Sequence, residues 1–158
     1  MAPSESAAEL YVHAMAIERE AAERYAELAA RMDDEGNFAV AELFRLLSTA
    51  EAKHLGELRR RAAGLELPPL SADHSWRDGE GAETVSLDAH GGPITQQKAL
   101  SLALDAEKAA RAFFENASRV CEDAETRALA REMAAEEQEH VTIIERMLER
   151  RLQRTSTS

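Results

Sequence analysis

The stretches Glu51-Ala-Lys-His54 and Glu137-Gln-Glu-His140 repeat one pattern, in which a histidine follows a glutamate by three residues. A lone glutamate precedes each stretch by about thirty residues: Glu18 in the first half of the chain and Glu107 in the second. Residues three apart share one face of an α-helix. The pattern therefore predicts four helices that direct four carboxylates and two imidazoles toward one point, as in a two-metal site inside a four-helix bundle.

Caps and breakers divide the chain into four expected helices, at about residues 6–32, 37–63, 95–120 and 124–154. A residue whose side chain can accept a hydrogen bond from a free backbone amide stands at each start: Ser6, Asn37, Thr95 and Asp123. The first and second helices are joined by a short segment, and so are the third and fourth, so we expect each of these two pairs to form an antiparallel hairpin. The segment 64–94 contains most of the Gly and Pro, so we expect a long crossover there that sets the second and third helices parallel.

The composition favours helices in one domain, 1–158, and excludes several classes of protein. The 158 residues are 44% hydrophobic but only 4% aromatic, and alanine, leucine and glutamate suit helices better than strands. The net charge of −11 opposes binding to nucleic-acid phosphates. The single cysteine, Cys121, excludes an internal disulfide and a four-thiolate metal site. No segment has the pattern of a membrane span or a signal peptide, so we expect a cytoplasmic protein.

Core positions should recur at alternating steps of three and four along each helix. Each expected helix carries such a row, which is apolar except at its centre, where the glutamates and histidines stand. An unpartnered carboxylate in a dry core costs several kcal/mol or takes up a proton, and neighbouring carboxylates repel one another. Two divalent cations would cancel the four charges. Oxygen and imidazole ligands suit iron or manganese, so we expect two iron ions, with manganese or a mixed pair as alternatives.

A purely structural explanation competes with this hypothesis. Glutamate is so frequent here that either Glu–His pair alone is only mildly surprising. The joint placement of both pairs and both lone glutamates in the apolar rows favours the metal site.

The segment from Ala16 to Tyr25 and the two E-x-x-H motifs, together with Glu107, resemble the rubrerythrin branch of the ferritin-like superfamily. The resemblance covers nearly the whole chain except the tail and much of the middle segment. It implies a ferritin-like four-helix bundle with a carboxylate-bridged di-iron centre, whose ligands and catalytic residues are Glu18, Glu51, His54, Glu107, Glu137 and His140. It also implies that Glu51 and Glu137 bridge the two metals, with Glu18 and His54 completing one and Glu107 and His140 the other.

This sequence differs from that family in three ways. Full-length rubrerythrins carry a rubredoxin domain with paired C-x-x-C motifs, which one cysteine cannot supply, so electrons must come from a separate donor such as a rubredoxin-like protein. An additional family glutamate corresponds to Ala110 here, which calls into question the ligand exchange linked to that glutamate. Of the family's tyrosines, Tyr25 can hydrogen-bond a ligating carboxylate, whereas the third helix offers only Phe113 and Phe114.

Several polar residues fall outside the pattern. Glu136 and Glu139 flank the second pair, and we expect them to be surface charges. His13, together with His74 and His90, should lie on the surface or in loops. We expect Trp76 to pin the crossover to the bundle or to a second subunit.

The leading hypothesis, based on the resemblance, is a non-haem di-iron oxidoreductase that reduces peroxide or dioxygen. A ferroxidase that handles iron is one alternative, and a metal-free helical interaction module is another. We expect a homodimer, with no nucleic-acid or membrane partner.

Overall fold

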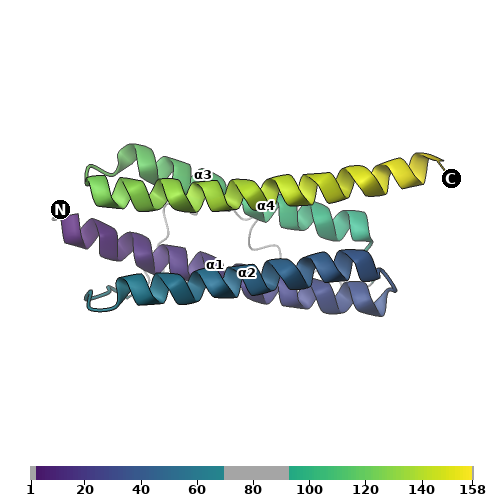
Figure 1. Cartoon of the computed structure of the whole chain (residues 1–158), viewed down its shortest axis with the longest axis horizontal. Helices are drawn as coiled ribbons and strands as arrows, with labels where there is room; N and C mark the ends of the chain where they lie inside the picture. Colours follow the sequence, from purple (N-terminus) through teal and green to yellow (C-terminus); the bar gives the residue numbers. More distant parts are fainter. Residues whose placement is uncertain (1–2, 70–92, 158) are drawn as a thin grey trace.

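The computed structural model of the chain describes residues 3–69 and 93–157 and places them in a four-helix bundle (Figure 1). The helices are α1 (Pro3–Asp34), α2 (Phe38–Ala62), α3 (Gln96–Val120) and α4 (Ala124–Thr157). Helices α1 and α2 form one hairpin and α3 and α4 the other, and α2 and α3 run in the same direction (Figure 1). The all-α fold with two hairpins and a long α2–α3 connection is therefore confirmed. The expectations for Trp76, His74 and His90 fall on residues 70–92, outside the described part.

Helix α1 ends in a turn that requires glycine. Gly36 has φ 77°, a left-handed conformation that glycine adopts without steric cost. The Gly36 amide donates to the Asp33 carbonyl at 3.0 Å, and the Asn37 amide donates to the Met32 carbonyl at 2.7 Å. This pair of hydrogen bonds satisfies carbonyls that the helix end would leave free, and it turns the chain directly into α2.

The predicted caps of α3 and α4 are confirmed. The Thr95 hydroxyl oxygen accepts a hydrogen bond from the Lys98 amide at 3.0 Å. The Asp123 carboxylate accepts hydrogen bonds from the Thr126 hydroxyl at 2.5 Å and from the Thr126 amide at 3.0 Å, and these two bonds lower the pKa of Asp123. Each cap fixes where its helix begins.

The caps at the starts of α1 and α2 differ from what the sequence predicted. Asn37 stands directly before α2, but its side chain accepts no capping hydrogen bond. The predicted start at Ser6 is wrong, because α1 already begins at Pro3. A proline at the first helical position lacks only an amide that the helix does not use, and its fixed φ suits the helix.

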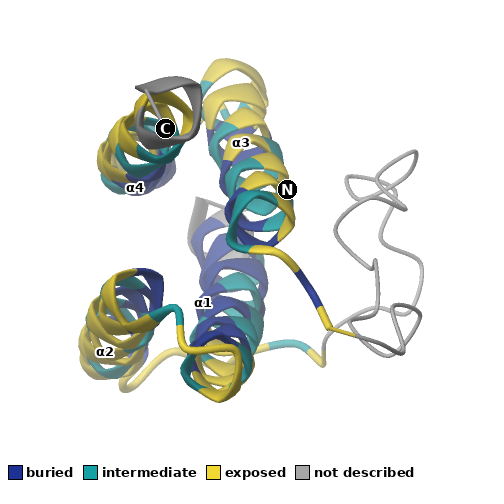
Figure 2. Ribbon diagram, turned by 90° about the vertical axis from the view of Figure 1, so that its right-hand side faces the viewer, coloured by how far each residue is buried: buried dark blue, intermediate teal, exposed yellow. Residues whose placement is uncertain are grey.

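Two apolar clusters fill the bundle, one toward each end. The buried faces of the helices turn inward (Figure 2). Tyr25, Phe44 and Leu100 belong to one cluster, and Phe114 and Met133 to the other. The predicted rows of core residues therefore do point inward. Between the clusters the rows reach their polar centres, so the glutamates and histidines lie at mid-bundle, closed off at both ends by packed side chains.

One position predicted for the surface lies in the core. His13 is buried, and its ring lies 5.9 Å from the ring of Phe113, centroid to centroid. The expectation of a surface role for His13 is thus wrong, because its ring packs against Phe113 of α3. None of the described helices is long and apolar enough to cross a membrane.

Candidate metal centre

The six residues singled out by their spacing come together at mid-bundle. Each helix contributes one glutamate, and α2 and α4 each add a histidine from the next turn. The imidazole of His54 is partly exposed, and the other five side chains are buried. These buried residues are Glu18, Glu51, Glu107, Glu137 and His140. Subsets of these residues bring ligand atoms within 4.8 Å of one another, a spacing at which one cation can be shared.

His140 faces two carboxylates from other helices. Its Nδ1 atom lies 3.3 Å from Oε1 of Glu51 and 3.4 Å from Oε1 of Glu107. Glu137, one turn before His140, completes a buried group of four potential ligands with these residues. This half of the site therefore combines one imidazole with three carboxylates, all shielded from solvent.

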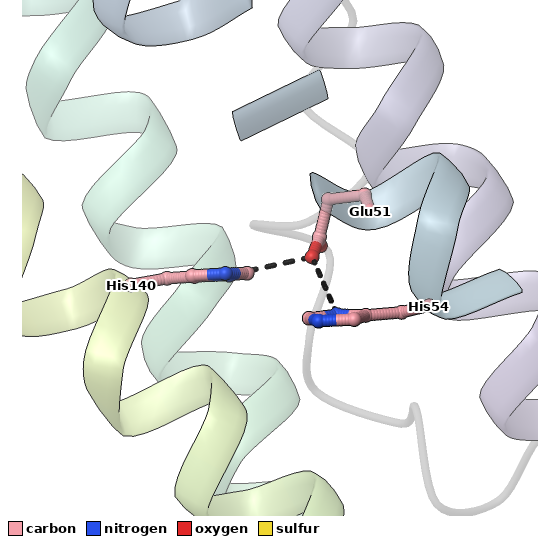
Figure 3. A group of neighbouring side chains, drawn as sticks. All are labelled: Glu51, His54 and His140. Carbon is pink, nitrogen blue, oxygen red and sulfur yellow. Dashed lines mark ion pairs between the residues drawn. The ribbon is translucent and has the colours of Figure 1, made fainter. Parts of the chain in front are cut away.

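His54 makes the corresponding approach from the other hairpin. Its Nδ1 atom lies 3.5 Å from Oε1 of Glu51 and 4.0 Å from Oε2 of Glu18. Figure 3 shows the two imidazoles on either side of the Glu51 carboxylate. The rings are nearly parallel, at 8°, with centroids 5.9 Å apart. A single oxygen of Glu51 thus lies between the two halves of the site.

Tyr25 supports one of the carboxylates. This tyrosine is buried, and its hydroxyl donates a short hydrogen bond to Oε1 of Glu107. A hydrogen bond of this kind fixes the orientation of a ligand carboxylate. Phe114 stands seven residues after Glu107, as Tyr25 does after Glu18, but it has no hydroxyl to offer.

Many polar atoms of the site have no hydrogen-bond partner among the described residues. These atoms are both carboxylate oxygens of Glu18 and Glu51, one oxygen each of Glu107 and Glu137, and Nδ1 of both histidines. Buried polar groups in native proteins are nearly always satisfied, and an unsatisfied charged group costs several kcal/mol. A cation satisfies lone pairs that no donor reaches, so this set of atoms fits a metal ion.

Burial determines how the carboxylates titrate. Burial first, and then the neighbouring Glu51, raises the pKa of Glu18 to about 9. Burial and Glu107 raise the pKa of Glu51 to about 8, and the same two causes raise the pKa of Glu137 well above its usual value. Near neutral pH the carboxyl groups of Glu18, Glu51 and Glu137 therefore keep their protons unless cations replace them.

His140 titrates in the opposite sense to an ordinary buried imidazole. Burial favours its neutral form, but the carboxylates of Glu107 and Glu51 outweigh this effect and raise the pKa of His140 to about 9. The two carboxylates at 3.3 and 3.4 Å from His140 Nδ1 therefore favour positive charge in this half of the site, from a proton or from a metal ion.

Comparison with known sequences identifies the family. Residues 8–152 match the family of ferritin-like domains. The chain belongs to this family. The ferritin-like protein also matches the crystal structure of an uncharacterized conserved protein from Magnetospirillum magnetotacticum MS-1, with 32% identity, 95% of each chain covered and a TM-score of 0.75. No curated protein matches it.

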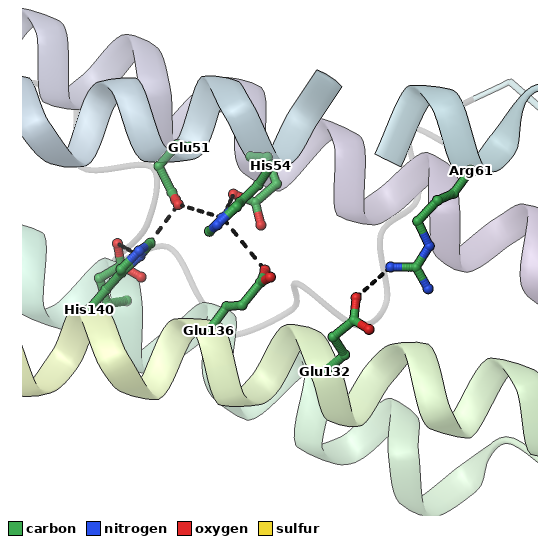
Figure 4. Close-up of polar contacts among 8 residues, drawn as sticks. Glu51, His54, Arg61, Glu132, Glu136 and His140 are labelled. Atoms are coloured by element: carbon green, nitrogen blue, oxygen red, sulfur yellow. Dashed lines mark hydrogen bonds and ion pairs between the residues drawn. The ribbon is translucent and has the colours of Figure 1, made fainter. Parts of the chain in front are cut away.

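One polar residue of this ferritin-like site was missed by the sequence reasoning. Glu136, expected to be a surface charge, is half-buried, and its Oε2 atom lies 3.5 Å from Nδ1 of His54 (Figure 4). With Glu18 and His54 it forms a third group of potential ligands. Its spacing of four residues from His140 indicates that Glu136 lies on the same face of α4 as that histidine, because residues four apart also share a helix face. Glu139, by contrast, is exposed as predicted.

A pocket between α1 and α3 reaches the site from outside. Its volume is about 40 Å³, and its lining includes Glu107, Glu137, Arg24 and the small residues Ala106 and Ala110. The alanine at position 110, where the rubrerythrin pattern has a further glutamate, leaves this path open. Space of this size accommodates only a molecule about as small as water or peroxide, beside carboxylates that are themselves almost fully buried.

Proposed function

We propose that this ferritin-like protein is a non-haem di-iron oxidoreductase, similar to rubrerythrin without its rubredoxin domain, that reduces peroxide or dioxygen. The observation that carries the proposal is the cluster of four carboxylates and two imidazoles at mid-bundle, most of whose inward-facing atoms have no hydrogen-bond partner in the part of the chain that the structure describes. When bound, a pair of iron ions supplies two electrons, the number needed to reduce peroxide to water. Catalysis and the preference for peroxide rest on the resemblance to rubrerythrins.

The six residues have distinct roles in this proposal. Glu18 and His54 would hold one metal, Glu107 and His140 would hold the other, and Glu51 and Glu137 would be shared between them. The place of Glu51 Oε1 between the two imidazoles, 3.5 Å from one and 3.3 Å from the other, supports its role as a bridge. The shared role of Glu137 comes from the resemblance.

Other residues prepare the site for redox chemistry. The Tyr25 hydroxyl holds the Glu107 carboxylate in one orientation. The apolar clusters on both sides keep bulk water away from the ends of the site, which strengthens electrostatic interactions there. The pocket at Ala106 and Ala110 admits a small oxidant.

Metal analysis with a redox assay tests the proposal. Purified protein is reconstituted with ferrous iron without oxygen, desalted and analysed for iron. We expect about two iron ions per chain, a visible absorption change when peroxide is added, and recovery of the reduced spectrum with an artificial electron donor. Fewer than about one iron per chain would overturn the proposal and leave a metal-free helical module. The Glu139→Gln variant controls for loss of one surface charge.

Iron handling is the second candidate, and membership of the ferritin-like family favours it. A ferroxidase would oxidise ferrous iron in large excess over its own sites, with dioxygen as oxidant. Size-exclusion chromatography separates the two cases further, because a storage cage elutes as a particle of many subunits, whereas we propose a homodimer that takes electrons from a separate, rubredoxin-like donor.

A further inference from the structure

The two halves of the proposed site have the same pattern but different surroundings. We call Glu18 and His54 the His54 position, and Glu107 and His140 the His140 position, with Glu51 between them. At the His140 position the imidazole is only 6% exposed and its carboxylate partner is held by Tyr25. At the His54 position the imidazole is 21% exposed. The His54 position is therefore the one closer to solvent.

Glu136 lies at the solvent side of the His54 position. Its carboxylate comes from α4, reaches across to α2, and lies as close to Nδ1 of His54 as Glu51 does, at 3.5 Å. The side chain is 29% exposed. Around it, a shallow surface pocket is lined by residues that include Arg61 and Glu132, which pair with each other (Figure 4). Glu136 thus contacts both the interior of the site and solvent.

Glu18 supplies a second, independent observation. Its side chain is fully buried, and neither carboxylate oxygen accepts a hydrogen bond from a described residue. Both Glu18 and Glu136 point at the same nitrogen of His54, at 4.0 and 3.5 Å. A donor such as Tyr25 could satisfy Glu18, but the corresponding residue of the repeat is Phe114. Glu18, His54 and Glu136 each offer a ligand atom within 4.8 Å of the others, and such a set fits a cation.

We propose that Glu136 is a further metal ligand, specific to the His54 position, through which that metal exchanges with solution while the metal at the His140 position is retained. The inference rests on the proposed two-metal function. The ligand set of Glu18, Glu136, Glu51 and His54 suits a hard divalent cation such as Mn²⁺ or Fe²⁺. Because Glu136 is the exposed member of this set, it is the ligand that water or a chelator displaces first.

Manganese binding to the full-length protein tests the inference without any redox reaction. Metal-free protein is titrated with Mn²⁺, and free Mn²⁺ is counted by its electron paramagnetic resonance signal. We expect about two Mn²⁺ per wild-type chain. In Glu136→Gln we expect one Mn²⁺ bound as in the wild type and the other weakened about tenfold or more, the loss typical when a group supporting a metal is removed. Glu139→Gln, on the exposed face of the same helix, should bind both as the wild type does.

The outcomes are distinguishable. Two sites of unchanged affinity in Glu136→Gln would overturn the role of Glu136 and leave the two-metal site intact. Equal weakening of both sites would overturn its specificity for the His54 position. A wild type that binds only one Mn²⁺ per chain would overturn the inference, and one that binds fewer than about one per chain would overturn the proposed function itself. Circular dichroism of each variant shows whether the bundle has kept its helices.

Discussion

Replacing Glu51 by glutamine should stabilise the protein when it carries no metal. Glu51 is fully buried, and burial and Glu107 raise the pKa of its carboxyl to about 8. Glutamine has the same shape and no charge, so it resembles the protonated carboxyl that the metal-free fold prefers. The substitution removes a cost of folding that exists only when the cavity lacks cations.

The size and sign of the effect follow from proton binding. The folded protein keeps a proton on Glu51 that the unfolded chain releases above about pH 4.5, so the wild type loses stability as the pH rises from there to about 8. Each pH unit in this window costs about 1.4 kcal/mol. At pH 7 the accumulated cost is roughly 3 kcal/mol, and at pH 5 less than about 1 kcal/mol. Glu51→Gln should recover these amounts.

Urea denaturation of chelator-treated protein measures the difference. Wild type, Glu51→Gln and the control Glu139→Gln are unfolded at about pH 5 and about pH 7, and the free energies of unfolding are compared. With saturating Mn²⁺ the order should reverse, because a ligand that binds only the folded state stabilises the wild type more. A metal-free Glu51→Gln protein that is less stable than the wild type near pH 7, or a difference that does not change with pH, would refute the reasoning.

Three further substitutions test the framework of the site. Tyr25→Phe removes the hydrogen bond to Glu107 and should weaken metal binding about tenfold, measured by competition with a chelator; unchanged affinity would contradict the supporting role of Tyr25. Phe44→Ala empties a fully buried position against the Tyr25 ring and should cost about 3–5 kcal/mol in urea denaturation; a cost under about 1 kcal/mol would show that the cluster collapses to fill the space. Gly36→Ala forces a left-handed alanine into the turn after α1, where the added Cβ meets nothing within 4 Å, so the expected loss of about 1 kcal/mol is conformational, and an unchanged midpoint would mean that the turn rearranges.

The sequence was sufficient for the bundle because its apolar rows have only one consistent arrangement. The steps of three and four that run through Glu18 and Glu51 place those residues in the core, and both are fully buried. The caps at Thr95 and Asp123 were also readable, because a capping side chain acts on amides only a few residues away. Local chemistry and periodicity together therefore fix the level at which the polar centres meet.

The positions of Glu136 and His13 could not be predicted from the apolar rows alone, because they depend on contacts between helices. Glu136 lies beside the buried Glu137 and looked like part of a charged surface, but its side chain is long enough to reach His54 on another helix. His13 likewise enters the core because of its contact with Phe113 on α3. Periodicity indicates which face of a helix is apolar, but not how far a long polar side chain at the edge of that face extends toward its neighbours.

The division of the bundle into two hairpins has a consequence for how the chain folds. Most contacts between helices lie within α1–α2 and within α3–α4, and far fewer join the two hairpins. Contacts between segments that are close in sequence form early, so each hairpin should assemble by itself and docking should be the late step. Docking is also the step that brings the carboxylates together. Cations that bind after docking should therefore slow the separation of the hairpins without accelerating their formation.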